Sequence, residues 1–332
     1  MNLKLSVIIP TLGKSPHLRG LLERLQRQRL EFPIEVLVVA NIPQQPLRNL
    51  VRSMGTNSQA HFEYHETGKL GVNFARNKGL ERARGDIILF LDDDVILDSD
   101  LFLQAHVEKH REFPDVAAIG GPYELVGRIT KYDSVYHEIA HEWLSHHTLA
   151  TPETTQLLGG NFSLKKSLVE KFSWRFDEEI IFGGAETGLC LRIARAGCRL
   201  VLLKDLAVAH SPQLSRMSFL RKAYMQGTGA KWRSENIPRP TRTFVNEFRP
   251  EFRYDDRELQ RVKNLYKFMF ACGWSGAPRK FGPFAIAGFM FQELKPLQMI
   301  RRQFRILYVN VRSAWLNGSR ENRPAIPPRT VP

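Results

Sequence analysis

The chain has 332 residues and a formal net charge of +14, with 43% hydrophobic and 25% charged residues. These are ordinary values for a soluble protein with one large domain or two smaller ones. The three cysteines fall in no paired ligand spacing, which excludes a disulfide framework and a thiolate metal site and fits a reducing compartment. The apolar N-terminal stretch is too short for a signal peptide, and residues 281–291 are too few and too interrupted to span a bilayer, so we expect a cytoplasmic protein.

Strands and helices are predicted to alternate along the first part of the chain. Short apolar runs predict strands, and apolar residues at helical spacing predict helices. Ser15-Pro16 has the residues of a helix start, an N-cap followed by proline at the first helical position. The expected strands are 3–9, 34–39, 87–91 and 116–121, with a weak one near 61–64, and the expected helices begin near 15, 71 and 101. This order predicts an α/β fold with a mostly parallel, doubly wound, Rossmann-like sheet.

Three consecutive carboxylates, Asp92, Asp93 and Asp94, follow the apolar run Ile87–Leu91. A strand buried on both faces would carry them to the carboxyl edge of the sheet, where α/β proteins bind ligands. If the extended geometry persists, Asp92 and Asp94 project together and Asp93 points away. Two such carboxylates repel unless a cation lies between them, and oxygen ligands suit Mg²⁺ or Mn²⁺. The pattern favours a metal–diphosphate site; the alternative is a solvated acidic turn before a helix.

Five short motifs follow one another in a fixed order between residues 3 and 210. They are Val7-Ile8-Ile9-Pro10-Thr11, Ala75-Arg76-Asn77-Lys78-Gly79, Gly85-Asp86 through Asp92-Asp93-Asp94, Gly159-Gly160-Asn161-Phe162, and Gly183-Gly184-Ala185-Glu186 with Leu189, Arg192 and Gly197. Together they resemble the family 2 glycosyltransferases of GT-A fold. The resemblance implies transfer of a sugar from a nucleotide-sugar donor to an acceptor hydroxyl, with inversion at the anomeric carbon. It places Asp92 near the donor's ribose, and Asp94 on a divalent cation that bridges the two phosphates.

The resemblance also suggests a catalytic base. The acidic pair usual in the family is here Ala185-Glu186, so the base maps onto Glu186 by position. Glu186 opens a predicted helix that Gly197 ends, and a helix N-terminus favours an ionised carboxylate. The alternative is that Glu186 only caps this helix electrostatically.

Further residues are assigned to the donor, the metal and the acceptor with the same resemblance. After the second strand, relatives usually carry an aspartate that recognises the nucleobase, and this chain has Ala40-Asn41 there. Asn41 is a candidate to hydrogen-bond the base, but the loss of the acid at Ala40 weakens the preference for a UDP-sugar. His210 ends a short apolar run where some relatives supply a metal ligand; an imidazole would favour Mn²⁺, but a lone histidine is also often structural. The remaining candidates are Pro10, Thr11, Arg76, Asn77 and Asp93 on the donor side, and Gly160, Asn161 and Trp143 on the acceptor side. Arg76, Asn77 and the glycine turn beside Asn161 also have purely structural interpretations.

A competing motif is His137-Glu138-Ile139-Ala140-His141, which matches the zinc-protease signature H-E-x-x-H. His147 follows where one subclass has a third ligand, but Leu144 occupies the position of the glycine which that subclass needs. We regard zinc hydrolysis as a less favoured alternative. A second alternative is a catalytically inactive GT-A domain that only binds a nucleotide-sugar or glycan.

The positive charge is concentrated at the C-terminal end. Residues 1–210 have a net charge of −1 and residues 211–332 a net charge of +15. We therefore expect a catalytic domain at 1–210 and a basic, mainly helical region at 211–332. Aromatic side chains near Arg301, Arg302 and Arg305 favour an anionic membrane surface over nucleic acid as its partner, at the inner face of the cell membrane, with a glycan or lipid-linked acceptor. The alternative is a basic helical subdomain that only packs on the core.

Overall fold

The computed structural model describes residues 4–275 apart from 55–58, 150–151, 182 and 238–251. All of them belong to a compact unit spanning Met1–Ala277. The predictions for the second unit, Pro278–Pro332, which includes the arginines at 301, 302 and 305, lie outside the described residues.

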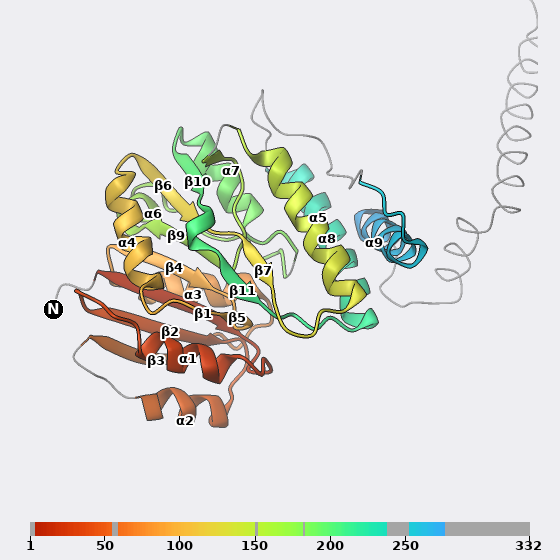
Figure 1. The fold of residues 1–332 in the computed structure, drawn as a ribbon. Helices are drawn as coiled ribbons and strands as arrows, with labels where there is room; N and C mark the ends of the chain where they lie inside the picture. The colour runs from red at the N-terminus through yellow and green to blue at the C-terminus, as the bar shows by residue number, and fades with distance from the viewer. Residues whose placement is uncertain (1–3, 55–58, 150–151, 182, 238–251, 276–332) are drawn as a thin grey trace, which may run out of the picture. The chain divides into compact units, whose positions relative to one another are not determined.

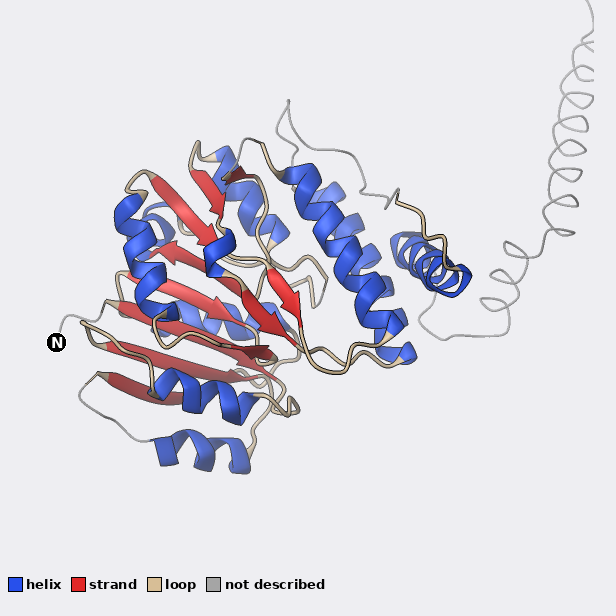
Figure 2. Cartoon of the chain, in the orientation of Figure 1, coloured by secondary structure: helices blue, strands red, loops and turns tan. Residues whose placement is uncertain are grey.

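An eight-stranded, mostly parallel sheet forms the centre of this unit (Figures 1 and 2). Its strands, in spatial order, are β3 (Ala60–Glu66), β2 (Ile34–Ala40), β1 (Leu5–Thr11), β4 (Ile87–Leu91), β9 (Asn161–Lys165), β6 (Val116–Gly120), β10 (Arg199–Leu202) and β8 (Glu153–Thr154). β9 runs antiparallel between β4 and β6, and β8 runs antiparallel to β10. Strands β1, β2, β4 and β6 are buried along their whole length, which explains their continuous apolar sequences.

Helices cover both faces of the sheet, so the predicted doubly wound α/β fold is confirmed. Alternate β1 residues point to opposite faces: Val7 packs in one apolar cluster and Ile8 in the other. The first cluster includes α1 (Leu18–Gln26), α2 (Gln45–Met54) and α4 (Phe102–Glu112), and the second includes α3 (Val72–Arg82), α6 (Lys166–Phe172) and α7 (Thr187–Arg195).

A third group of helices packs beside the sheet layers. It consists of α5 (Lys131–His147), α8 (Arg216–Asn236) and α9 (Arg257–Ser275), which share a cluster of buried side chains that includes Ile139, Phe219 and Tyr266. A small second sheet, β5 (Val95–Ile96), β11 (Val208–His210) and β7 (Tyr123–Leu125), and a short 3₁₀ helix, η1 (Lys204–Leu206), complete the described elements. The described part of the basic C-terminal region thus contains two long helices that bury apolar side chains against α5.

Three details differ from the sequence-based expectations. Helix α2 was not among the expected helices, although its buried side chains Leu47, Val51 and Met54 recur at helical spacing. Helix α1 begins at Leu18 with His17 as N-cap, so the predicted cap at Ser15 is wrong, although Ser15 Oγ accepts a hydrogen bond from the His17 amide (3.2 Å). The antiparallel strand β9 was not expected.

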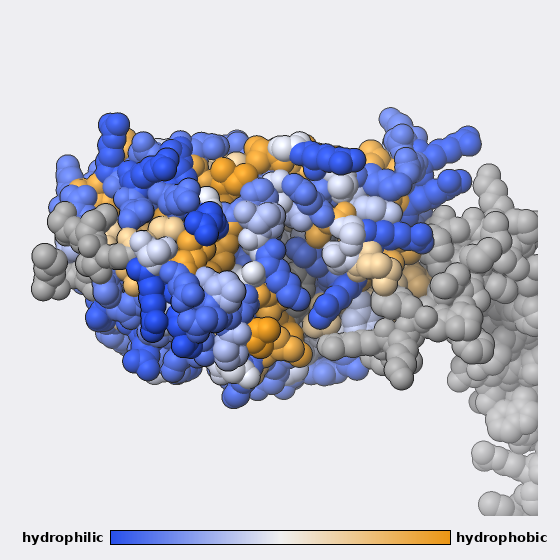
Figure 3. Space-filling model, turned by 90° about the horizontal axis from the view of Figure 1, so that it is seen from below, coloured by the Kyte–Doolittle hydropathy of each residue, from blue (hydrophilic) through white to orange (hydrophobic). Residues whose placement is uncertain are grey.

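Among the described residues, none of the helices is both long and apolar enough to cross a membrane. From the side shown in Figure 3, apolar side chains form separate patches within a mostly hydrophilic surface.

Candidate active site

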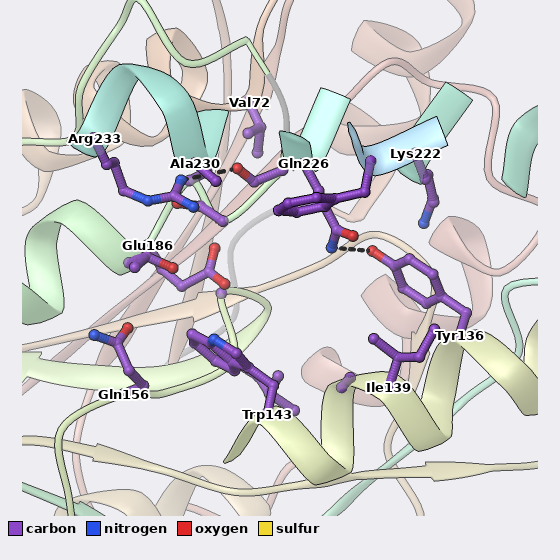
Figure 4. Close-up of a pocket in the computed structure, with 18 of the residues that line it drawn as sticks. Val72, Tyr136, Ile139, Trp143, Gln156, Glu186, Lys222, Gln226, Ala230 and Arg233 are labelled. Atoms are coloured by element: carbon purple, nitrogen blue, oxygen red, sulfur yellow. Dashed lines mark hydrogen bonds between the residues drawn. The ribbon is translucent and has the colours of Figure 1, made fainter. Parts of the chain in front are cut away.

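A cavity of about 340 Å³ lies between the sheet and the helices α5, α8 and α9. Six of the residues predicted from the sequence line it: Arg76, Asp92, Asp94, Trp143, Glu186 and His210. They come from segments that are far apart in the chain, and the fold brings them to one place. Figure 4 shows Glu186 and Trp143 pointing into this space, with Lys222, Gln226 and Arg233 of α8 around it.

Asp92 is held by two side chains from different elements. Arg76 Nη2 of α3 lies 3.2 Å from its Oδ1, and the hydroxyl of Tyr123 on β7 donates to its Oδ2 (3.2 Å). The same Tyr123 hydroxyl accepts a hydrogen bond from the Gly160 amide (2.9 Å). A Cβ added at Gly160 would lie 2.1 Å from the carboxyl carbon of Asp92, so glycine is required for this close approach. Asp92 is therefore oriented before any ligand binds.

Asp94 pairs with His210. The distance from His210 Nε2 to Asp94 Oδ1 is 3.2 Å, and the imidazole ring stacks on Tyr123 with ring centroids 4.6 Å apart. Burial opposes the charged form of Asp94, but the hydrogen bond and electrostatic attraction to His210, with the charge of Lys222, lower its pKa overall. An ionised carboxylate beside an imidazole is a suitable donor set for Mn²⁺.

Asp93 has a different environment from its two neighbours. It does not line the cavity and accepts a hydrogen bond from Thr11 Oγ1. Burial, together with the nearby charges of Asp94 and Asp92, raises the pKa of Asp93 to about 7, although the bond from Thr11 opposes the rise. Thr11 and Asp93 thus fix the acidic turn to the end of β1.

Glu186 is the N-cap residue of α7, yet its side chain makes no capping hydrogen bond and lines the cavity instead. Burial raises its pKa, while the charge of Arg76 opposes the rise; Arg76 Nη1 lies 3.9 Å from Glu186 Oε2. Desolvation therefore has a larger effect on the pKa of Glu186 than the charges and backbone groups that favour its ionised form.

Two glycines with positive φ precede Glu186. Gly183 (φ 90°) and Gly184 (φ 63°) adopt backbone conformations that residues with a Cβ rarely adopt, and their carbonyls both accept hydrogen bonds from Arg233 Nη1 of α8 (3.1 and 2.9 Å). Burial lowers the pKa of Arg233 to about 10, although the charges of Glu186 and Asp177 oppose the shift. Helix α8 therefore contributes to the position of the loop that carries Glu186.

Several predicted residues do not line the cavity. Asn41 donates to the backbone carbonyls of Lys69 and Gly71 (2.9 and 2.7 Å), and so closes the turn before α3. Asn77 forms hydrogen bonds with both backbone groups of Phe176, and Asn161 donates to the Leu206 carbonyl (2.7 Å). The other residues of this kind are Pro10 and Thr11 on β1, Asp93, and Gly160.

The histidines and the glutamate of the H-E-x-x-H motif lie on α5, where their side chains contact other protein groups. His137 and His141 contact each other, with ring centroids 4.1 Å apart, and His141 Nε2 lies 3.3 Å from the Tyr123 carbonyl oxygen. Glu138 shares a hydrogen bond with Tyr254, which acts with burial to raise the pKa of Tyr254. Within the described ranges, no group of three or more His, Cys, Asp or Glu side chains is arranged to hold a metal ion by itself. The zinc alternative therefore gains no support.

Sequence reasoning missed several polar residues of the site, among them Tyr123, Gln156, Gln226 and Arg233. Tyr123 lies on a three-residue strand and the others lie in segments without a recognisable motif. Arg233 offered a weak signal as one basic residue among many in the C-terminal third of the chain.

Residues 6–172 match the sequence profile described as "Glycosyl transferase family 2". The chain belongs to glycosyl transferase family 2. The curated relatives include "Uncharacterized glycosyltransferase YfnE" of Bacillus subtilis (strain 168), 28% identical over 118 residues, which are 36% of this chain and 30% of that protein. Another is "GalNAc(5)-diNAcBac-PP-undecaprenol beta-1,3-glucosyltransferase" of Campylobacter jejuni, 28% identical over 92 residues, which are 27% of this chain and 29% of that protein. These matches therefore span less than a third of each relative's length.

The GT-A fold of this family 2 member is supported by a solved structure. The mannosyltransferase PcManGT from Pyrobaculum calidifontis, solved in complex with GDP-Man and Mn²⁺, aligns with a TM-score of 0.55 at 17% identity. The alignment covers 95% of this chain and 88% of that chain. The architecture expected from the five sequence motifs is therefore confirmed.

Proposed function

We propose that this family 2 protein is an inverting glycosyltransferase, which transfers a sugar from a nucleotide-diphosphate donor to an acceptor hydroxyl. The observation that carries the proposal is the placement of the Glu186 carboxylate in the same cavity as Asp92 and Asp94, with Arg76 between them. In-line displacement at an anomeric carbon needs a base on one side of the sugar and a stabilised leaving group on the other. This cavity offers both.

Glu186 is the proposed base. A raised pKa suits this role because a carboxylate whose pKa moves toward the working pH accepts a proton more readily. Arg76 limits the rise, which keeps the ionised form accessible. Asp92, oriented by Arg76 and Tyr123, is proposed to contact the donor's ribose, and Pro10, Thr11, Asn41, Asn77 and Asp93 to shape the donor side.

Asp94 and His210 fit a divalent cation, Mn²⁺ or Mg²⁺. In sites of this kind the protein supplies one or two ligands, and substrate phosphates and water supply the rest. The bound cation would stabilise the negative charge that develops on the diphosphate leaving group. The imidazole of His210 favours Mn²⁺.

The biological setting is also a proposal. The basic charge of residues 211–332 and the named relative that acts on an undecaprenol-linked substrate favour synthesis of a cell-surface polysaccharide or glycolipid, by a peripheral protein at the cytoplasmic face of the membrane. A UDP-sugar remains the favoured donor, although PcManGT was solved with GDP-Man.

The test is sugar transfer and donor hydrolysis with Mn²⁺, using UDP-, GDP- and dTDP-sugars. Removing a general base lowers rates roughly 10²- to 10⁴-fold, so Glu186→Ala should show a loss of this size while donor binding persists. Asp94→Ala should lose activity and the response to Mn²⁺. Asp98→Ala, which removes an exposed carboxylate four residues away, is the matched control and should leave activity unchanged.

Two outcomes would contradict the proposal. Wild-type protein that binds a nucleotide-sugar without turning it over would favour the inactive binding domain. Full activity in Asp94→Ala would remove the proposed metal site.

A further inference from the structure

Gln156 has an unusual position in the cavity. Its side chain is fully buried and lines the cavity, yet neither its amide nitrogen nor its amide oxygen has a hydrogen-bond partner among the described residues. A buried amide without partners is unfavourable, and such groups are rare in folded proteins. The unpaired atoms of Gln156 therefore require an explanation, and the cavity beside them suggests a ligand.

The backbone of Gln156 is fixed by its neighbour. The amide of Gln156 donates to Thr154 Oγ1 (3.2 Å), and the same hydroxyl donates to the Gln156 carbonyl (2.9 Å). The backbone of Gln156 is thus fixed just after the end of β8.

Gln226 in the same cavity provides a contrast. Its amide nitrogen donates to Tyr136 (2.9 Å; Figure 4), and its amide oxygen accepts from Tyr266. Both polar atoms of the Gln226 side chain are therefore hydrogen-bonded within the protein, and they connect α5 with α9. The side-chain nitrogen and oxygen of Gln156 are both available to a ligand.

The surroundings of Gln156 indicate what it could bind. Figure 4 shows Gln156, Trp143 and Glu186 around the same part of the cavity. Trp143 contributes an indole ring, supported by His147 with ring centroids 4.7 Å apart, and Leu158 and Ile139 add apolar wall. An aromatic ring next to a group that both donates and accepts suits a ligand with an apolar ring face and hydroxyl groups at its edge.

The chemistry of the amide discriminates between ligand classes. A phosphate only accepts hydrogen bonds and an ammonium group only donates them, so either would leave one atom of Gln156 unpaired. Neighbouring hydroxyls of a sugar can do both. Arg233 is engaged with the carbonyls before Glu186, and Arg76 Nη2 with Asp92 and the Gly159 carbonyl (2.7 Å), whereas Arg76 Nε and Nη1 have no hydrogen-bond partner among the described residues.

We infer that Gln156 and Trp143 form an acceptor subsite for an uncharged sugar ring, with Trp143 against its face and Gln156 bound to two of its hydroxyls. This inference rests on the proposed transferase function and adds the acceptor class: the hydroxyl presented to Glu186 belongs to a glycan unit, not to a lipid phosphate.

The experiment compares Gln156→Met with the wild type, using methyl glycosides of glucose, galactose, mannose and N-acetylglucosamine as acceptor probes and farnesyl phosphate as the phosphate probe. Methionine keeps the volume and removes both polar atoms. Loss of two hydrogen bonds should lower the acceptor kcat/KM roughly 10- to 100-fold. Donor hydrolysis, in which water replaces the acceptor, should stay within about twofold. Gln45→Met, on the exposed side of α2, is the matched control.

A second measurement guards against misfolding and against failure of the transferase proposal. The urea midpoint of Gln156→Met should not fall, because the substitution removes an unpaired buried amide. Methyl glycosides should quench the tryptophan fluorescence of the wild type saturably, and the variant should bind them more weakly.

The outcomes separate the two proposals. Unchanged acceptor kcat/KM in Gln156→Met with intact donor hydrolysis, or use of farnesyl phosphate alone, would overturn the subsite and leave the transferase function standing. If the wild type turns over no donor, the fluorescence titration still decides: equal binding by wild type and variant, or binding by neither, overturns the subsite.

Discussion

Lowering the pH should destabilise this protein through two buried histidines away from the cavity. His106 and His110 of α4 both contact the Ser163 hydroxyl of β9, with Nδ1 and Nε2 at 3.0 and 2.9 Å. Burial lowers the pKa of His106 to about 4. Burial, with the charges of His106 and Lys165, lowers the pKa of His110 to about 3. Each is therefore neutral in the folded protein at pH 5, but protonated in the unfolded chain, where the pKa is about 6.5.

The sign follows from the number of bound protons. Below pH 6.5 the unfolded chain binds more protons at these residues than the folded protein, so their contribution to stability is present above this pH and decreases as the pH falls. Between pH 7.5 and 5.0 each histidine should reduce the free energy of unfolding by about 2 kcal/mol. Asp93 has the opposite effect, because its pKa is higher in the folded protein than in the unfolded chain. Its contribution to the free energy of unfolding therefore increases as the pH falls below about 7.

The substitution His110→Gln isolates one of these contributions. Gln keeps a polar group near Ser163 and does not titrate, and Asp93 is common to both proteins, so its contribution cancels in the comparison. Urea unfolding followed by tryptophan fluorescence at pH 7.5 and 5.0 should show that the wild type loses about 2 kcal/mol more than the variant. His61→Gln, at a partly exposed position of β3, is the control. Equal losses in wild type and His110→Gln would refute the linkage.

Three further predictions follow from the site and the charge distribution. Tyr123→Phe keeps the ring that stacks on His210 but removes the hydrogen bond to Asp92. A hydrogen bond to a charged group contributes about 1.5–3 kcal/mol, so the donor KM should rise roughly 10- to 100-fold, while the Mn²⁺ concentration for half-saturation should stay the same. An unchanged donor KM would contradict this prediction. Gly160→Ala should displace Asp92 and weaken donor binding, whereas Gly20→Ala, with open space around the new Cβ, should not; equal donor KM values in the two variants would show that the clash is relieved elsewhere. Replacing Arg301, Arg302 and Arg305 with Gln in the full chain should reduce salt-sensitive pelleting with vesicles containing phosphatidylserine; unreduced pelleting would exclude these residues as the membrane contact.

The fold was predictable because its signals are local. The continuous apolar runs of β1, β2 and β4 mark strands buried on both faces, and the order of strands and helices then specifies a doubly wound sheet. The antiparallel insertion of β9 was not predictable, because Asn161–Lys165 carries no signal for the direction of its neighbours. Strand direction depends on where the long connection through α5 returns.

The site was predictable only where a motif names a residue. Asp92, Asp94 and Glu186 could be proposed from short motifs, but the contacts that define their environments are long-range. Tyr123 contacts Asp92 from a strand that the sequence does not reveal, and Arg233 contacts the loop before Glu186 from almost fifty residues further along the chain. Side-chain partners of this kind depend on tertiary packing and not on spacing.

Arg76 explains how one fold can serve both halves of the proposed reaction. It is almost fully buried, and its Nη2 lies 3.2 Å from Asp92 while its Nη1 lies 3.9 Å from Glu186. The Phe176 ring lies 5.3 Å from its guanidinium, which limits the room for the side chain to move. Displacement at a sugar carbon requires the base and the donor to keep a fixed geometry, since small errors in position lower the rate greatly. A buried cation between the two carboxylates reduces their mutual repulsion, so α3, which carries no proposed reacting group, contributes to the geometry of the site.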